Sequence, residues 1–234
     1  MKLNSYKISI IIPVLNEEKC IAGVLNYLKE NSTPANIHEI IVVDGSSTDS
    51  TIKIAKNNGA SVIYAPKGRA KQLNNGAKHA KGTILYFLHA DTLPPKDFDK
   101  SIINAVHNGN LVGSFQMKFD SDSRFLSFFA WFTRVNHTLC RGGDQSLFIT
   151  KTFFQKMNGF NENYIIYEDN EFIGRVYKTT RFKILPFHVK TSARRYEEQG
   201  QIRLQYHFGI LHLKNYFGAG PEQLYDYYKR KIAL

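Results

Sequence analysis

Short apolar runs alternate with amphipathic segments through the first half of the chain. Four runs rich in β-branched and aromatic side chains are typical of buried strands: residues 8–14, 40–43, 60–64 and 83–88. Between these runs, apolar side chains recur at helical spacing, first after Asn16, and a further helix is predicted from Pro94 onward. Strands that alternate with helices form parallel sheets covered by helices on both faces. The pattern therefore predicts the α/β class, with a Rossmann-like, mostly parallel sheet flanked by helices.

The second half of the chain has a less regular pattern. Residues 112–119 alternate between apolar and polar side chains, which favours an antiparallel strand. Further strands are predicted at 145–150 and 182–189, and helices at 125–135, 152–159, 168–177, 201–216 and from Pro221. No repeat or low-complexity linker divides the chain. We predict one domain over residues 1–234. Its nucleotide-binding half ends at about residue 110, and its acceptor half, at about 111–234, adds a mixed extension of the sheet and the C-terminal helices.

Two of the predicted strands end in an acid. Asp44 follows the apolar run 40–43, and Asp91 follows the run 84–90. Parallel strands deliver such side chains to the carboxyl edge of the sheet, where open α/β folds bind ligands. One carboxylate is suited to accept hydrogen bonds from a nucleotide, and the other to hold a divalent cation against its phosphates.

The chain is strongly basic, with 31 Lys and Arg against 20 Asp and Glu and a formal net charge of +11. This charge fits a solvated basic surface, an anionic substrate, an anionic membrane surface or nucleic acid. No zinc-finger, RRM-like or helix-turn-helix signature is present, so nucleic acid is not a predicted partner.

Other features of the sequence indicate the compartment. No run approaches the roughly 20 apolar residues that span a bilayer, and the first residues do not form a signal peptide. Cys20 and Cys140 have neither metal-binding nor disulfide spacing. We expect reduced thiols in a cytoplasmic protein, with weak peripheral contact at the inner face of the membrane as a further interpretation of the charge.

Several motifs together resemble a known family. Residues 10–18 and the stretch from Asp44 to Thr51 are similar to the opening of the family-2 glycosyltransferases, His89-Ala90-Asp91 occupies the place of that family's Asp-x-Asp motif, and Glu168-Asp169 matches its later acidic pair. The chain also resembles a small bacterial subgroup of this family. The matching stretches there are residues 68–70, 88–92, 143–145, 192–196 and 217–221.

The resemblance implies a GT-A fold, a nucleotide-sugar donor, a divalent metal (Mn²⁺ or Mg²⁺) and inversion at the anomeric carbon. It further implies donor contacts from Pro13, Asn16, Glu17, Asp44 and Arg69. Of these, Arg69 lies in a glycine-rich loop and is also explained as a solvated basic turn.

The metal site that the resemblance implies depends on Asp91. One carboxylate together with the substrate diphosphate is a reasonable site for Mg²⁺ or Mn²⁺, which take several ligands from phosphate and water. His89 replaces the first acid of the two-acid motif and is equally explained as a packed neighbour of the site. The substitution leaves strict metal dependence open.

The pair Glu168-Asp169 begins a predicted helix, where acids also stabilise the helix dipole. The functional interpretation makes Asp169 the general base for an acceptor hydroxyl and Glu168 its support. If the acceptor is a phosphate, the nucleophile is already ionised and no strong base is needed.

Three further segments have two interpretations each. Gly143, Asp144 and Gln145 form either an acceptor loop or a tight turn that enters a strand. Arg194 and Arg195 either neutralise the departing diphosphate or pair at the surface with Glu197 and Glu198. The aromatic segment 125–132 forms part of the core, or else an acceptor wall or membrane contact.

The predicted function is an inverting, metal-assisted glycosyltransferase. It uses a nucleotide-sugar donor, with uracil weakly preferred over guanine, and an unknown hydroxyl or lipid-phosphate acceptor. One alternative is a sugar-phosphate nucleotidyltransferase, but the glycine-rich loop of those enzymes is replaced here by residues 15–18. The other alternative is a non-catalytic nucleotide- or carbohydrate-binding protein.

Overall fold

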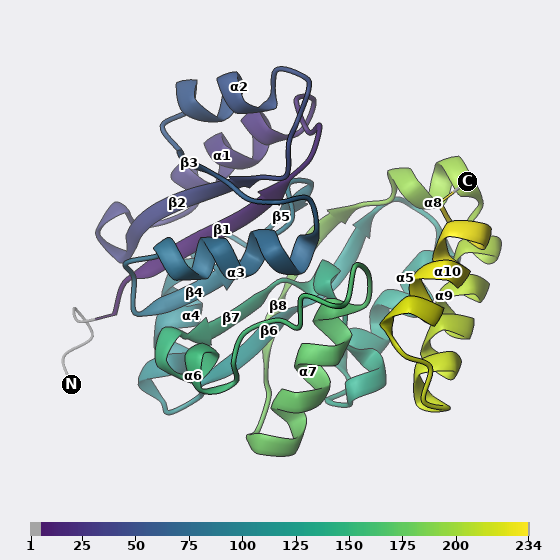
Figure 1. Ribbon diagram of the computed structural model, residues 1–234. Helices are drawn as coiled ribbons and strands as arrows, with labels where there is room; N and C mark the ends of the chain where they lie inside the picture. Colours follow the sequence, from purple (N-terminus) through teal and green to yellow (C-terminus); the bar gives the residue numbers. More distant parts are fainter. Residues whose placement is uncertain (1–5, 234) are drawn as a thin grey trace.

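The computed structural model describes residues 6–233. Within these residues one sheet of eight strands has the order β3-β2-β1-β4-β7-β6-β8-β5 (Figure 1). The strands are β1 (Ile8–Val14), β2 (Ile37–Asp44), β3 (Ser61–Tyr64), β4 (Ile84–Phe87), β5 (Thr92–Leu93), β6 (Val112–Asp120), β7 (Leu147–Thr150) and β8 (Lys183–Ser192). The first four strands are mutually parallel, whereas β7 runs antiparallel to both β4 and β6. The mixed half therefore extends the parallel half, as the sequence predicted.

Helices cover both faces of the sheet and build a separate group near the C-terminus (Figure 1). Residues of α1 and α4 pack on one face, residues of α3, α6 and α7 on the other, and α5, α8, α9 and α10 share a third cluster. The helices are α1 (Ile21–Glu30), α2 (Thr51–Asn57), α3 (Arg69–His79), α4 (Phe98–His107), α5 (Arg124–Trp131), α6 (Lys151–Lys156), α7 (Glu168–Thr179), α8 (Arg194–Gln199), α9 (Gln201–Tyr216) and α10 (Pro221–Lys231).

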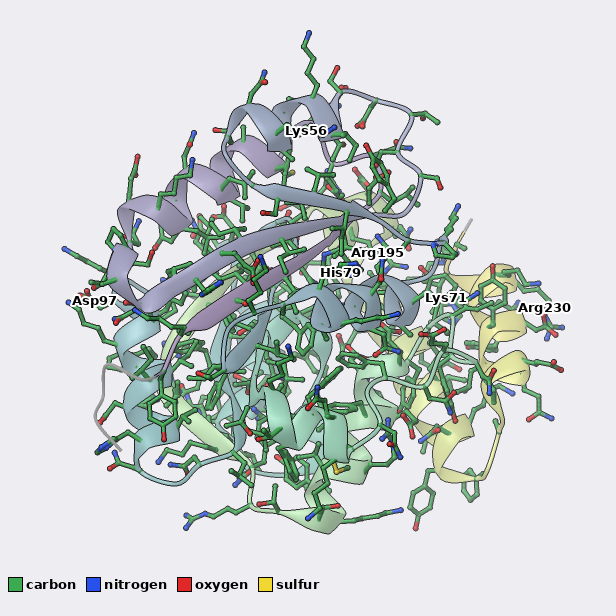
Figure 2. All side chains as sticks on the ribbon, turned by 60° about the vertical axis from the view of Figure 1, so that its left-hand side comes forward. Lys56, Lys71, His79, Asp97, Arg195 and Arg230 are labelled. Atoms are coloured by element: carbon green, nitrogen blue, oxygen red, sulfur yellow. The ribbon has the colours of Figure 1, made fainter. Side chains whose placement is uncertain are left out.

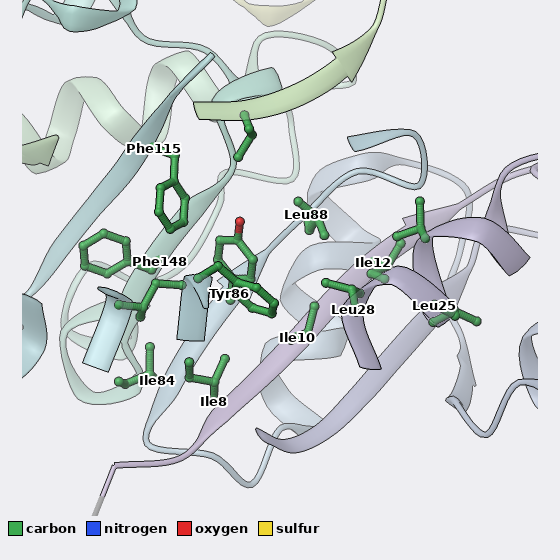
Figure 3. Packing of buried hydrophobic residues seen from close by; sticks show 14 of the residues in the cluster. Ile8, Ile10, Ile12, Leu25, Leu28, Ile84, Tyr86, Leu88, Phe115 and Phe148 are labelled. Atoms are coloured by element: carbon green, nitrogen blue, oxygen red, sulfur yellow. The ribbon is translucent and has the colours of Figure 1, made fainter. Parts of the chain in front are cut away.

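The central strand β1 shows why the sheet is buried on both sides. Successive side chains of a strand point to opposite faces. Ile8, Ile10 and Ile12 belong to the cluster that includes α1 and α4, and Figure 3 shows Ile10 and Ile12 on the side of Leu28 and Leu25, with Ile8 beside Ile84. Ile11 belongs to the cluster on the opposite face. A strand that is apolar on both sides needs a covering layer on each face, which α1 with α4 and α3 with α6 provide.

The structure differs from the predicted elements at several places. β6 pairs antiparallel with β7 only at Val112 and Gly113, and it runs parallel to β8 along most of its length. The alternation in β6 therefore does not report the direction of pairing, because Val112–Phe115 are buried on both faces and exposure alternates only from Lys118 onward. The two-residue strand β5 and the short helix α8 were not predicted.

Two helices begin later than predicted. α1 starts at Ile21, because Asn16 has a left-handed backbone (φ 57°) and the residues after it form a turn. α4 starts at Phe98, because Asp97 also has a positive φ of 56°. Asp97 is the residue directly before α4, whereas Asn16 is separated from α1 by the turn of residues 17–20.

Cys20 and Cys140 are both free cysteines. None of the helices in residues 6–233 is both long and apolar enough to cross a membrane.

Gly76 allows α3 to lie close to the sheet. A Cβ at this position would collide with the side chain of Ile11 and would lie 3.0 Å from Cγ2 of Val43. We expect Gly76→Ala to lower the free energy of unfolding by about 1–2 kcal/mol, because overpacking costs about 1–3 kcal/mol and the gain in helix propensity returns at most ~1 kcal/mol. Urea unfolding followed by circular dichroism measures the change.

Gly174 offers a matched control in the interior of α7. A Cβ at Gly174 would meet nothing within 4 Å. Gly174→Ala should therefore raise stability by about 0.5–1 kcal/mol through helix propensity alone. If Gly76→Ala is as stabilising as Gly174→Ala, the close packing of α3 against β1 and β2 is wrong.

Candidate functional site

The carboxyl ends of β1, β2 and β4 meet at one edge of the sheet. Val14 pairs with Asp44 in the register of β1 and β2, and Phe87 at the end of β4 pairs with Ile11. The loops that follow these strands therefore emerge together, at the position where open α/β sheets bind ligands. The first turn of α3 reaches the same edge, because Gln72 donates from Nε2 to the backbone carbonyls of Val14 (2.8 Å) and Val43 (2.9 Å).

The loops after β1 and β2 are bound to each other. Asn16 accepts a hydrogen bond at Oδ1 from the N–H of Thr48 (2.8 Å) and donates its own N–H to Oγ of Ser47 (2.9 Å). The N–H of Glu17 donates to Oγ1 of Thr51 (2.8 Å). The side chain of Asn16 is thus engaged in fixing the two loops, which holds Glu17 in place at their junction.

Asp44 is 3% exposed and accepts hydrogen bonds from its own turn. The N–H of Ser46 donates to Oδ2 (3.1 Å), and the N–H of Ser47 donates to Oδ1 (3.0 Å). These bonds satisfy the buried carboxylate within the protein. Contact between Asp44 and a nucleotide base remains a prediction.

A cavity of about 320 Å³ opens at this edge. This volume is at the lower end of the range of small-molecule sites. Among the predicted site residues, its wall includes Pro13, Glu17, Arg69, Asp91, Asp144 and Arg195. Asn16, Asp44, Arg194, Gly143, Gln145, Glu168 and Asp169 are not part of that wall, and they reach the cavity only through neighbouring residues.

Arg69 links the cavity to the acidic pair on α7. Its Nε lies 3.1 Å from Oε1 of Glu168, whose side chain is 3% exposed. Burial alone would lower the pKa of Arg69, but the carboxylates of Glu168, Asp169 and Asp144 around it raise the pKa above its ordinary value. Burial in turn raises the pKa of Glu168 to about 7, although the charge of Arg69 opposes the shift.

His89 lies between Arg69 and Asp144. Its Nε2 contacts Nη2 of Arg69, and its Nδ1 lies 3.4 Å from Oδ1 of Asp144. Because a guanidinium can only donate, Nε2 of His89 must accept, and the ring proton is then on Nδ1 and faces Asp144. The side chain of Asp144 is 53% exposed, so the desolvation that would raise its pKa is only partial, and the hydrogen bond and charge of His89 with the charge of Arg69 hold that pKa below its ordinary value.

Asp169 is anchored on both carboxylate oxygens. Oδ2 accepts from the N–H of Gly143, and Oδ1 accepts from the N–H of Asn170 (2.7 Å). A Cβ at Gly143 would collide with Asp169 and with the guanidinium of Arg69. The absence of a side chain at Gly143 therefore allows the acidic pair and Arg69 to approach the same loop. Gln145 is buried and donates from Nε2 to the carbonyl of Cys140 (2.8 Å), which places it inside that loop.

The two neighbouring arginines of α8 have different surroundings. Arg195 lines the cavity, and its guanidinium lies over the rings of Phe208 (5.7 Å) and Tyr228 (5.4 Å) and contacts the hydroxyl of Tyr228. Arg194 is exposed, and its charge acts on Glu17, whose pKa is nevertheless raised because burial dominates. In residues 6–233, neither arginine makes an ion pair with Glu197 or Glu198.

Three residues of the site were not identified from the sequence. Gln72 and Phe208 line the cavity, and His212 accepts or donates a hydrogen bond of 2.7 Å with the hydroxyl of Tyr167, the residue before Glu168. His212 and Phe208 lie on α9, which carries His212 to Tyr167 beside the acidic pair and Phe208 to Arg195 and Tyr196. No local sequence pattern identifies polar helix residues such as Gln72 and His212 as site residues, because their burial and partners depend on how the helix packs.

The side chains at the site do not by themselves form a closed metal site. Among residues 6–233 there is no group of three or more His, Cys, Asp or Glu side chains that could hold one. Asp91 lines the cavity, and its carboxylate accepts a long hydrogen bond from Oγ1 of Thr92 at 3.4 Å. Such a weakly engaged carboxylate fits an ion that takes its remaining ligands from phosphate and water, and it does not fit a closed site made of protein side chains.

Comparison with known families decides the class of the chain. The model of the family described as Glycosyl transferase family 2 matches residues 9–185. The chain belongs to this family. The matched region includes the loops at the cavity and the acidic pair, and it ends before α8, α9 and α10.

Curated relatives match only part of their own length. A glycosyltransferase of Methanococcus voltae, named dolichyl N-acetyl-alpha-D-glucosaminyl phosphate 3-beta-D-2,3-diacetamido-2,3-dideoxy-beta-D-glucuronosyltransferase, is 35% identical over 104 residues. The match covers 41% of this family-2 chain and 32% of the relative. The chain thus spans about a third of the length of this relative.

Solved structures share the fold. The complex of Staphylococcus aureus TarS residues 1–349 with UDP has a TM-score of 0.66 at 23% identity, over 80% of this chain and 60% of that chain. The mannosyltransferase PcManGT from Pyrobaculum calidifontis, in complex with GDP-Man and Mn²⁺, has a TM-score of 0.70 at 17% identity, over 96% and 70% of the two chains. The predicted GT-A fold is confirmed.

The raised pKa of Glu168 predicts a pH-dependent stability. The native state keeps a proton on Glu168 up to about pH 7, whereas the unfolded chain releases it near 4.5. The contribution of Glu168 to the free energy of unfolding is therefore fully present below its pKa in the unfolded chain, and it is lost as the pH rises through about 7. Relative to Glu168→Gln, we expect the wild-type free energy of unfolding to fall by about 3 kcal/mol across this window, at ~1.4 kcal/mol per pKa unit.

Urea unfolding of both proteins at a series of pH values measures this difference. Glu222→Gln, which removes an exposed carboxylate from α10, controls for the loss of one charge. A constant difference between wild type and Glu168→Gln over the whole window would show that the burial of Glu168 does not perturb its ionisation.

Proposed function

We propose that this chain is an inverting glycosyltransferase that moves a sugar from a nucleotide-sugar donor to an acceptor hydroxyl. Membership of glycosyl transferase family 2 supports the class of reaction. The observation that carries the proposal is the position of Arg69, which lines the cavity with Asp91 and also pairs with Glu168 beside Asp169. A donor in the cavity would thus lie next to the acidic pair.

The donor is proposed to bind along the loops at the sheet edge. Pro13 and Glu17 line the cavity, with Asn16 and Asp44 directly behind them. Arg195 adds a cation on the opposite wall, and Arg194 extends the positive charge toward Glu17, which suits a diphosphate. TarS was solved with UDP and PcManGT with GDP-Man, so a uracil donor remains only the weakly preferred choice.

Asp91 is proposed as the protein ligand of a divalent ion, Mn²⁺ or Mg²⁺. Its carboxylate faces the cavity without a strong hydrogen bond, and PcManGT was solved with Mn²⁺. When bound, such an ion would neutralise charge that develops on the departing diphosphate. Both ring nitrogens of His89 face Arg69 and Asp144, so His89 is not proposed as a ligand.

Asp169 is proposed as the general base. Oδ1 accepts from both the N–H and the side-chain amide of Asn170, whereas Oδ2 accepts only from the N–H of Gly143 and retains a lone pair for the acceptor proton. The acceptor oxygen would form its bond to the anomeric carbon on the face opposite the diphosphate, its proton would pass to Asp169, and the bond to the diphosphate would break with its electron pair. The configuration is then inverted. Gly143, Asp144 and Gln145 are proposed to border the acceptor, because their loop holds Asp169.

The donor site is tested by thermal stability. A ligand that binds only the native state adds about 2.7 kcal/mol at a hundred times its dissociation constant, which corresponds to several degrees in a chain of this size. We expect UDP with Mn²⁺ or Mg²⁺ to raise the melting temperature more than UDP alone. Asp91→Asn should remove the metal-dependent part and leave the rest.

The control for this test is Asp97→Asn. Asp97 is an exposed acid away from the cavity, labelled in Figure 2, and its left-handed backbone tolerates asparagine. The variant should behave as the wild type does. If the metal raises the melting temperature of Asp91→Asn as much as that of the wild type, Asp91 is not a metal ligand.

The base is tested by turnover. With the nucleotide sugar that gives the largest thermal shift, we expect Asp169→Asn to lower transfer to a hydroxyl acceptor, or hydrolysis of the donor, by about 10²–10⁴-fold. The affinity for the donor should stay nearly constant, because Asp169 does not line the cavity. Release of the nucleoside diphosphate measures turnover, and Asp97→Asn again serves as the control. A loss well below tenfold would reject Asp169 as base for a hydroxyl and would favour an acceptor phosphate.

A further inference from the structure

Several aromatic and aliphatic side chains of one segment of the acceptor half are exposed. They lie on α5 and on the 3₁₀ turns Phe132–Arg134 and Thr138–Cys140 that follow. Ring centroids are 5.2 Å apart between Phe128 and Phe132 and 5.5 Å apart between Trp131 and Phe132. We name this group the aromatic surface, and its exposed members are Phe128 (58%), Trp131 (53%), Phe132 (36%), Val135 (40%) and Leu139 (62%).

The aromatic surface is part of an ordered helix whose other face is buried. Leu126 and Ala130 are 0% and 5% exposed, and Leu126 packs into the C-terminal cluster of helices. Oγ of Ser123 caps α5 by accepting from the N–H of Leu126 (3.2 Å). Buried Arg141 donates to the carbonyls of Thr133 and Val135 and fixes the turn that follows α5. The exposure of the aromatic rings is therefore a property of the fold.

Positive charges outnumber negative ones around the aromatic surface, although the exposed acid Asp122 lies two residues before Arg124. Residues 123–143 contain no Asp or Glu, and Arg124, Arg134 and His137 are exposed within them. Burial lowers the pKa of His188 on β8, and the charges of Arg134 and Lys118 add to this shift, so both cations lie on the side of the molecule that carries His188. In residues 6–233 neither arginine nor Lys118 makes an ion pair, whereas the nearby Asp120 is paired with Lys190 at 2.7 Å.

We infer that the aromatic surface docks on an anionic lipid bilayer, with Phe128 and Trp131 in the interface and Arg124, Arg134 and Lys118 at the headgroups. Aromatic side chains prefer the membrane–water interface, and amphipathic helices with basic flanks bind anionic lipid through both contributions. The residues of the aromatic surface line neither the site cavity nor the smaller cavity between Ile165 and Tyr225, so the surface is separate from both.

A second copy of the chain is a poorer occupant of this surface. A two-fold interface places the same patch of both subunits face to face. Arg124 and Arg134 would then meet the equivalent cations of the other subunit, with no acid in residues 123–143 to offset them. An anionic bilayer accommodates the aromatic rings in its interface and also neutralises the cations with its headgroups.

Docking in this way would orient the candidate site. The aromatic surface ends at Leu139, four positions before Gly143, whose N–H holds Asp169. Gln145 also bonds back to the carbonyl of Cys140 (2.8 Å). The acceptor side of the cavity would therefore lie near the headgroups. The docking itself does not depend on the proposed function, and binding alone tests it.

Vesicle binding provides the test. At an ionic strength of about 0.01 M, we expect the protein to co-sediment with phosphatidylglycerol-containing vesicles and not with phosphatidylcholine alone. Binding should fade toward about 1 M, where the Debye length shrinks from about 30 Å to about 3 Å. Trp131 is the only tryptophan, so its emission should shift to the blue on binding and be quenched by brominated lipid.

Matched variants separate the aromatic surface from general charge. The pair Phe128→Ser and Trp131→Ser should weaken binding by about tenfold or more. Tyr64→Ser, which removes an exposed ring (62%) from the far edge of the sheet at β3, should not. Arg124→Gln with Arg134→Gln should weaken binding more than Lys53→Gln with Lys56→Gln on α2, at the opposite side of the molecule, although both pairs remove the same charge (Figure 1).

Three results would overturn the inference. The first is no binding to anionic vesicles at low salt. The second is binding that both charge pairs weaken equally and that leaves the emission of Trp131 unchanged, because the overall charge then suffices. The third is a dimer in sedimentation equilibrium that Phe128→Ser dissociates, which would assign the aromatic surface to a second copy.

Discussion

The site depends on one guanidinium placed among four carboxylates. Arg69 begins α3 and pairs with Glu168 on α7, while Asp169, Asp144 and Asp91 lie close enough for their charges to act on it. Glu168 is buried, and a buried acid without a partner is strongly unfavourable. The four acids come from three separate segments of the chain. The same cation that opposes the rise of the Glu168 pKa therefore also holds together the strand ends, the acidic pair and the Gly143 loop.

Around Arg69, most polar groups of the edge are already engaged with the protein. Asn16 joins the loops after β1 and β2, Asp44 closes its own turn, and Gln72 binds two strand-end carbonyls. Such bonds fix the loops before any ligand arrives, which lowers the cost of ordering a site on binding. Asp91 differs from these residues because its carboxylate has little contact with protein donors, and this leaves it available to a ligand.

The sequence predicted the parallel half of the fold and the edge that carries the site. Apolar runs such as Ile8–Val14 are bounded by turn residues, and an acid that directly follows a buried run must find a polar partner at the end of its strand. By contrast, β5 has two residues and exists because Thr92 meets Thr191, which no local pattern reveals. His212 and Gln72 were missed for the same reason, since each acquires its partner only when a helix packs against a distant segment.

The strand order has a consequence for synthesis of the chain. β1, β2, β3 and β4 are all complete by residue 87, but the other edge of β4 pairs with β7 at Leu147–Thr150. At about 5–20 residues per second, the ribosome needs on the order of several seconds to deliver β7. During that time the apolar edge Ile84–Phe87 is unpaired and can join a neighbouring nascent chain. Slower initiation of translation, which spaces the ribosomes farther apart on the mRNA, should therefore favour soluble protein over inclusion bodies.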